Sequence, residues 1–76
     1  MARIQNWEPK LRKAIAVARR EAGLSQRTLS DELGESNAFI QKIESGNRDV
    51  SASEFINIAI ALGIDPSELL RRAIGE

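Results

Sequence analysis

The chain has 76 residues with no cysteine or histidine, which excludes disulfides and Cys/His zinc sites as sources of stability. This length allows one small domain, predicted to span residues 1–76, and hydrophobic residues at 42% supply its core. The formal net charge of zero argues against strong bulk attraction to a polyanion.

Five segments with helical periodicity follow one another along the chain. Four glycines separate them and fit helix C-termini, namely Gly23, Gly34, Gly46 and Gly63. The first predicted helix runs from about Trp7 or Glu8 to Ala22, with Asn6 as its candidate N-cap. The second predicted helix opens at Ser25, which is a favourable N-cap residue.

Three more helices are predicted in the second half of the chain. The third opens at Ser36, and the fourth opens with the capping-box pair Ser51 and Glu54. The fifth opens with a second box at residues 65–68, has Pro66 at its first position and continues to Ile74. No segment alternates as a strand does. The sequence therefore predicts an all-α, compact five-helix domain whose core covers about residues 8–74.

The stretch over residues 26–45 is predicted to form two short helices joined by a tight turn. Their inward apolar residues are Leu29 and Leu33 on one helix and Ile40 and Ile43 on the other. Ser30 is small where the two helices cross, and Gly34 is able to adopt the positive φ that such a turn requires. These features favour a helix-turn-helix.

The outward side of the second of these helices carries short, amide-bearing or cationic side chains: Ser36, Asn37, Ala38, Gln41 and Lys42. Asparagine and glutamine bond bidentately to adenine, lysine donates to guanine, and an alanine methyl contacts the thymine methyl. This side is therefore a candidate surface for reading base edges in the major groove.

The residues that carry a family resemblance are Gly23-Leu24-Ser25-Gln26, Leu29-Ser30, Leu33-Gly34, Ile40, Ile43-Glu44 and Gly46. At this spacing the chain resembles the Cro/cI-type helix-turn-helix (XRE) family over about residues 8–74. The resemblance implies a lambda-repressor-like fold and a transcriptional regulator that binds double-stranded DNA. It also implies that the base-reading residues are the five on the outward side of the third helix.

The same resemblance implies contacts to the DNA backbone and one structural ion pair. The candidate phosphate-contacting residues are Gln26, Arg27, Asn47, Arg48, Ser51 and Ser53. The helix amides near Ser51 to Ser53 are suited to bind a phosphate as well. Arg19 and Glu44 match a partly buried pair that ties the first helix to the third.

The fifth helix suggests a homodimer. Its candidate interface residues are Ile64, Leu69, Leu70 and Ile74. A two-fold dimer places two recognition helices about 34 Å apart and requires an inverted-repeat operator. The leading hypothesis is a repressor or autoregulator that binds such an operator.

An alternative is a protein-interaction module, or an antitoxin-like partner protein, that retains the fold. It is motivated by the zero net charge, by Glu35 in the turn, and by Phe39 as an exposed aromatic residue. If the chain does bind DNA, a second protein that regulates it is a further candidate partner. Arg12, Lys13 and Arg20 are interpreted as a solvated face of the first helix.

The sequence does not favour an enzyme. Histidine, cysteine and tyrosine are absent, and the carboxylates are dispersed over caps and exposed faces. No glycine-rich phosphate loop or metal-ligand cluster occurs, so we expect no cofactor and no metal. No apolar run reaches the roughly 18 residues of a membrane helix, and we expect a cytoplasmic protein without a membrane partner.

Overall fold

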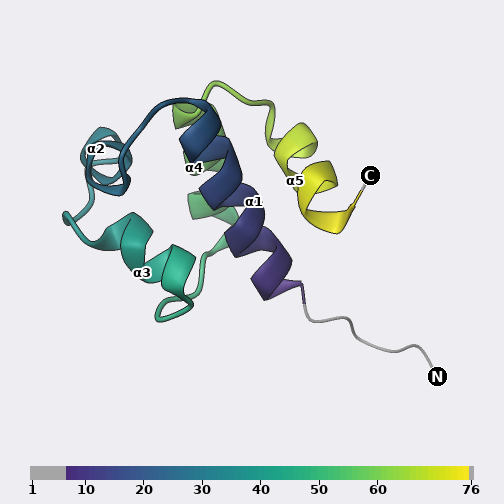
Figure 1. Ribbon diagram of the computed structural model, residues 1–76, viewed down its shortest axis with the longest axis horizontal. Coiled ribbons are helices and arrows are strands. Elements are labelled where there is room, and N and C mark those ends of the chain that lie inside the picture. Colours follow the sequence, from purple (N-terminus) through teal and green to yellow (C-terminus); the bar gives the residue numbers. More distant parts are fainter. Residues whose placement is uncertain (1–6, 76) are drawn as a thin grey trace.

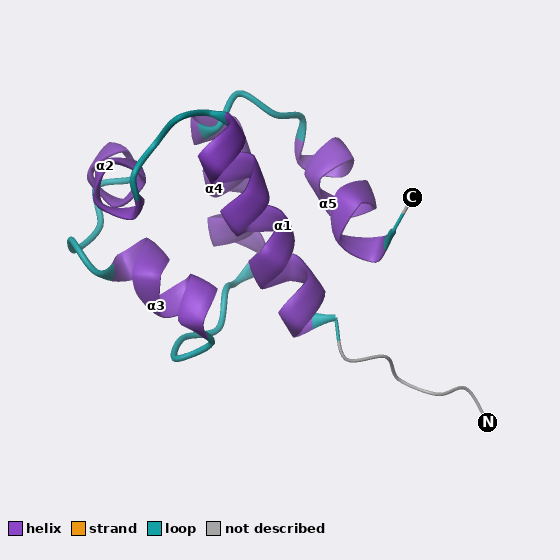
Figure 2. Ribbon diagram, in the orientation of Figure 1, coloured by secondary structure: helices purple, strands orange, loops and turns teal. Residues whose placement is uncertain are grey.

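The computed structural model describes residues 7–75, and the five predicted helices are present in this range. They are α1 (Glu8–Glu21), α2 (Gln26–Glu32), α3 (Phe39–Ser45), α4 (Ala52–Ala61) and α5 (Pro66–Ile74). Residues 7–75 contain no strand (Figure 2), and the predicted all-α fold class is confirmed. Asn6, the expected cap of α1, lies outside the described residues. Within the described range, no helix has the length and apolar character that crossing a membrane requires.

Local capping chemistry sets the starts of three helices. The Ser25 hydroxyl accepts a hydrogen bond from the Thr28 N–H at 3.0 Å and opens α2. Ser51 and Glu54 form a complete capping box at the start of α4. At α5, the Asp65 carboxylate accepts from the Ser67 N–H at 2.8 Å. The three starts are confirmed, and each cap lies within its own segment of the chain. The second capping box expected at residues 65–68 is not formed, because the Glu68 carboxylate accepts from Arg72 instead.

The predicted start of the third helix at Ser36 is wrong. Helix α3 begins at Phe39, and the Phe39 N–H donates to the Ser36 carbonyl in a turn that precedes the helix. The N-cap position is Ala38, whose side chain has no acceptor. The Ser30 hydroxyl of α2 serves as the capping acceptor instead, because it accepts a hydrogen bond from the Ile40 N–H at 3.0 Å. The acceptor thus comes from a neighbouring helix, which a local pattern does not reveal.

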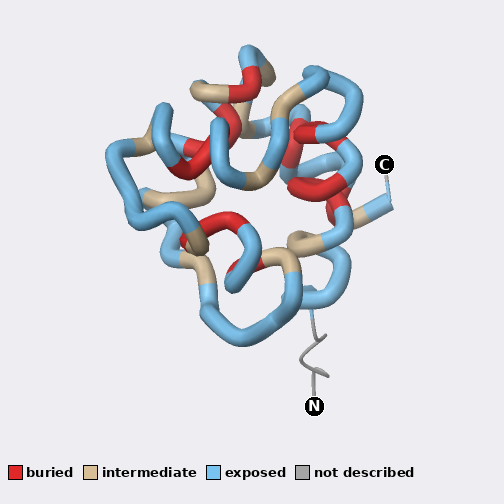
Figure 3. The backbone as a smooth tube through the Cα atoms, turned by 60° about the vertical axis from the view of Figure 1, so that its left-hand side comes forward, coloured by how far each residue is buried: buried red, intermediate tan, exposed pale blue. Residues whose placement is uncertain are grey.

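The helices α2 and α3 lie on one side of α1, and α5 lies on the other (Figure 1). Helix α4 crosses behind α1 in this view and packs against α2 and α5. Buried segments of all five helices face the interior (Figure 3). The largest fully buried apolar side chains are Ile15, Leu29, Ile40, Ile43, Ile58 and Leu69. One continuous core therefore holds α3 against the rest of the domain.

Two expectations about exposure are corrected by this core. Phe39 is only 4% exposed, because the ring turns inward at the first residue of α3. Leu69 is fully buried within the single domain, so its side chain is not available to a second copy. Phe39 thus no longer supports an exposed aromatic contact, and Leu69 leaves the set of candidate interface residues.

Candidate nucleic-acid interface

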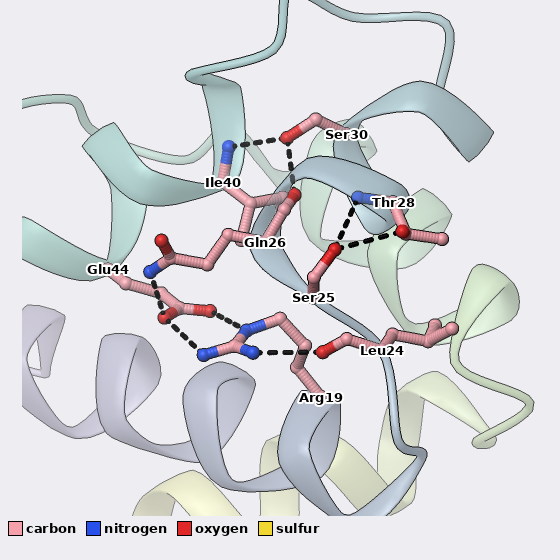
Figure 4. Close-up of polar contacts among 8 residues, drawn as sticks. All are labelled: Arg19, Leu24, Ser25, Gln26, Thr28, Ser30, Ile40 and Glu44. Atoms are coloured by element: carbon pink, nitrogen blue, oxygen red, sulfur yellow. Dashed lines mark hydrogen bonds and ion pairs between the residues drawn. The ribbon is translucent and has the colours of Figure 1, made fainter.

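A buried serine fixes the angle between α2 and α3. The Ser30 hydroxyl donates to the Gln26 carbonyl at 2.8 Å and accepts from the Ile40 N–H at 3.0 Å (Figure 4). A larger side chain at this crossing point would push the helices apart. Gly34 has φ +72° in the connecting turn, a conformation that strains any residue with a Cβ. Together they hold the N-terminal end of α3.

A buried carboxylate holds the other end of α3. Glu44 accepts from Arg19 through both carboxylate oxygens, at 2.7 and 3.1 Å, and its Oε1 also accepts from Gln26 Nε2 at 2.8 Å. Arg19 donates in addition to the Leu24 carbonyl at 2.9 Å (Figure 4). The Arg19 and Glu44 side chains are only 11% and 7% exposed. This network joins α1, α2 and α3, so the orientation of α3 is fixed at both ends.

The candidate base-reading residues occupy two parts of the α3 region. Ser36, Asn37 and Ala38 lie in the turn that precedes α3, while Gln41 and Lys42 lie on its outward side. Ala38 is half-buried and the other four are exposed. Within residues 7–75, none of the four polar side chains is engaged in a hydrogen bond or ion pair. Their donors and acceptors therefore remain available to a ligand.

The candidate phosphate contacts differ in how free they are. Arg27 and Ser53 are exposed, whereas the Gln26 amide is bonded to Glu44 and the Ser51 hydroxyl caps α4. The Asn47 backbone N–H donates to the Lys42 carbonyl at 2.9 Å, which closes the loop after α3. That loop follows Gly46, whose φ of +85° ends the helix.

Arg48, expected to contact phosphate, is engaged with a carboxylate in this structure. Its Nη1 and Nη2 donate to the two carboxylate oxygens of Glu54, both at 2.8 Å, and Nη1 also donates to the Asp49 carbonyl. The guanidinium lies 4.7 Å from the centroid of the Phe39 ring. Hydrogen bonds from Arg48 and from the Ser51 backbone lower the pKa of Glu54 to about 2.

The helix α1 adds basic residues that the sequence interpretation had assigned to a solvated face. Arg12, Lys13 and Arg20 border an open hollow of about 430 Å³, and Gln26 and Gln41 lie on its other side. Within the described residues, these three cations have no carboxylate in ion-pair contact. Glu44 also lines the hollow but is paired with Arg19, so the three cations leave the hollow electropositive. The hollow is continuous with the outward surface of α3 at Gln41. Positions 12, 16 and 20 are four residues apart, so the sequence indicates that they lie on one side of α1. The sequence does not indicate which other helix that side faces.

Of the four candidate dimer residues, only Leu70 borders an apolar hollow, which lies between α1, the start of α4 and α5. Leu70 is 47% exposed and lines a space of about 450 Å³ with Leu11, Phe55, Ile56 and Pro66. The surface of this hollow is almost entirely apolar. Two further candidates, Ile64 and Ile74, are half-buried. Leu70 is therefore the candidate with the most accessible apolar surface.

Comparisons with known proteins agree with this geometry. A helix-turn-helix family model matches residues 15–69. An XRE-family like protein from Pseudomonas syringae pv. tomato str. DC3000 is 29% identical with a TM-score of 0.83, covering 91% of this chain and 84% of that chain. The clp gene regulator ClgR from Corynebacterium glutamicum is 24% identical with a TM-score of 0.84, covering 95% and 94%.

A hypothetical transcription factor, NHTF from Neisseria, is 22% identical with a TM-score of 0.77, covering 92% of this chain and 84% of that chain. The similarities to ClgR and to the Neisseria protein concern the fold alone. No curated protein matches the chain at a significant level. The family model includes all of α2 and α3, and the structural similarities extend over nearly the whole chain.

Proposed function

The chain belongs to the XRE-type helix-turn-helix family, and from this premise we propose that it is a sequence-specific transcriptional regulator that inserts α3 into the major groove of DNA. The observation that carries the proposal is the outward side of α3. Within residues 7–75, its polar side chains make no hydrogen bond or ion pair, while Ser30 and Glu44 hold the helix at both ends. Preorganisation of this kind lowers the ordering cost of binding.

Base reading is assigned to the turn before α3 and to its first exposed residues. Asn37 and Gln41 have the amide pair that matches adenine, and Lys42 donates to guanine. The Ala38 methyl matches the methyl of thymine. In helix-turn-helix proteins the N-terminal part of the recognition helix contacts the bases. Although α3 begins at Phe39 and not at Ser36, the proposed base-reading residues still lie at or just before its N-terminal end.

Backbone contacts flank the base-reading residues on two sides. Arg20 and its neighbours in the α1 hollow lie beside Gln41, and Asn47 lies in the loop after α3. With a net charge of zero, these cations supply a modest electrostatic term and a shallow dependence on salt. Most discrimination between sequences then rests on base contacts.

We propose a second copy of the chain as the occupant of the apolar hollow at Leu70. An exposed leucine beside an apolar concavity on the same face suits an isologous contact, in which each copy offers both parts. The dimer would bind an inverted repeat with half-sites about one helical turn apart. Repression is the proposed mode, because occupation of a promoter by the dimer blocks other proteins from it.

The alternative of an interaction module without DNA binding has lost one of its supports. Phe39 is buried under Arg48 and offers no aromatic surface to a partner. Glu35 and the zero net charge remain compatible with it.

Selection from a randomised duplex library at low salt separates these two functions. We expect an enriched motif with two-fold symmetry. A folded protein that enriches no motif refutes the DNA-reading function.

A further inference from the structure

Glu54 binds groups for which the family resemblance implies contacts to a DNA phosphate, namely Arg48 and the start of α4. Its two carboxylate oxygens accept from both Nη groups of Arg48, and Oε1 also accepts from the Ser51 backbone N–H at 2.9 Å. Arg48 and the residues that open α4 are, with Asn47, the backbone-contacting features expected after α3. One carboxylate therefore engages Arg48 and the start of α4 within the same chain.

The geometry of this contact is that of anion recognition. A guanidinium fork binds a carboxylate and a phosphate in the same bidentate manner. Both Nη1 protons of Arg48 are used, one by Glu54 and one by the Asp49 carbonyl, and Nη2 donates to Glu54 as well. The Phe39 ring covers one face of the guanidinium at 4.7 Å. A DNA phosphate must therefore displace Glu54 or bind beside its fixed negative charge.

We propose that Glu54 is an affinity-limiting residue, which holds Arg48 and the start of α4 as an internal substitute for a DNA phosphate. This inference rests on the proposed DNA-binding function. Binding of a duplex exchanges the Glu54 contact for a phosphate contact, so Arg48 adds little net affinity in the wild-type chain. In this proposal, the pairing of Arg48 with Glu54 also makes the surface that faces DNA less positive.

The test compares two glutamine substitutions that change the net charge equally. Glu54→Gln removes the anion but retains an acceptor for the Ser51 N–H, so the capping box persists. Glu68→Gln is the control, because Glu68 also pairs with an arginine, Arg72, at 2.9 Å, although its side chain is more exposed than that of Glu54. Its position on α5 is distant in the chain from α3 and from the loop that follows it.

Binding is measured by fluorescence anisotropy over a salt series, with the selected operator and an unrelated duplex of equal length. We expect Glu54→Gln to bind both duplexes about two- to fivefold more tightly, the range for one exposed ion pair. The slope of log affinity against log salt should steepen by about 0.9, the value for one phosphate. Glu68→Gln should remain close to wild type. The gain should disappear in the double variant Arg48→Ala/Glu54→Gln.

Other outcomes separate this inference from the proposed function. If wild type binds its operator and Glu54→Gln matches Glu68→Gln or binds more weakly, the function stands and the inference fails. If no variant binds any duplex, both fail. Glu54→Ala is the second variant, because the Ser51 hydroxyl still accepts from the backbone N–H of residue 54. Glu54→Ala should show the same gain in DNA affinity. If this variant is folded by circular dichroism but binds no more tightly than wild type, the inference is overturned.

Discussion

Substitution of Ser30 by alanine isolates the contact that sets the angle between α2 and α3. The serine is fully buried, and so is Ile40, whose N–H donates to the serine hydroxyl. Alanine leaves this donor without a partner, whereas the Gln26 carbonyl keeps its place in the helical ladder of α2.

The expected loss of stability follows from the unpaired Ile40 N–H and from the helix propensity of alanine. A buried N–H without a partner costs about 1–3 kcal/mol in the free energy of unfolding. The better helix propensity of alanine offsets about 0.5 kcal/mol of this loss. We therefore expect Ser30→Ala to lower the free energy of unfolding by about 0.5–2.5 kcal/mol. In a domain of this size, that corresponds to a fall in Tm of about 2–20 °C.

Ser45→Ala is the matched control for this measurement. Ser45 also lies in a short helix and also donates to a main-chain carbonyl, that of Lys42, at 3.1 Å, but its hydroxyl is exposed. Its replacement should change stability by no more than about 0.5 kcal/mol. Thermal and urea unfolding followed by circular dichroism compare the two variants. Equal stability of the two variants would refute the idea that Ser30 holds α3.

Three further substitutions address the interface. Lys42→Ala should relax the preference for one base by about 1–3 kcal/mol, which repeated selection detects; an unchanged motif contradicts the assignment. Arg20→Gln should weaken binding to all duplexes alike and reduce the slope of log affinity against log salt by about 0.9. Arg71→Gln on α5, with the same charge change, should leave this slope unchanged. Equal slopes for the two variants would contradict a contact between α1 and DNA. Leu70→Asn should shift the monomer–dimer equilibrium toward monomer in sedimentation, while Ile60→Asn, at an exposed position that does not border the hollow, should not; similar behaviour of both variants argues against this dimer surface.

Helices that carry their own caps were predictable from the sequence. Ser25, Ser51 and Asp65 each bond to an N–H two or three residues later, so short-range pattern and structure coincide. The start of α3 was not predictable in this way. Its first turn is satisfied by Ser30 from another helix, and this contact exists only after α2 and α3 have packed.

The charged contacts show the same division between local and tertiary information. The family resemblance pointed to Arg19 and Glu44, and the structure places them 2.7 Å apart. The pairing of Arg48 with Glu54 depends on how the loop after α3 folds back onto α4. For Arg20, spacing gave the helical stripe, but its neighbour Gln41 comes from the packing of α1 on α3. The sequence therefore predicted α3 as the DNA-reading helix, while packing determined which cations lie beside it.

The most direct test of α3 as the reading helix is an NMR titration of the ¹⁵N-labelled protein with the selected duplex. The side-chain amide signals of Asn37 and Gln41 should shift strongly, because the proposal places these groups against the base edges. The backbone amide of Lys42, which donates to the Ala38 carbonyl within the helix, should shift as well because its own side chain contacts a base in the proposed complex. The amide of Arg71 on α5 serves as an internal reference and should change little. Shifts confined to α5, with Asn37 and Gln41 unchanged at saturation, would contradict insertion of α3 into the major groove.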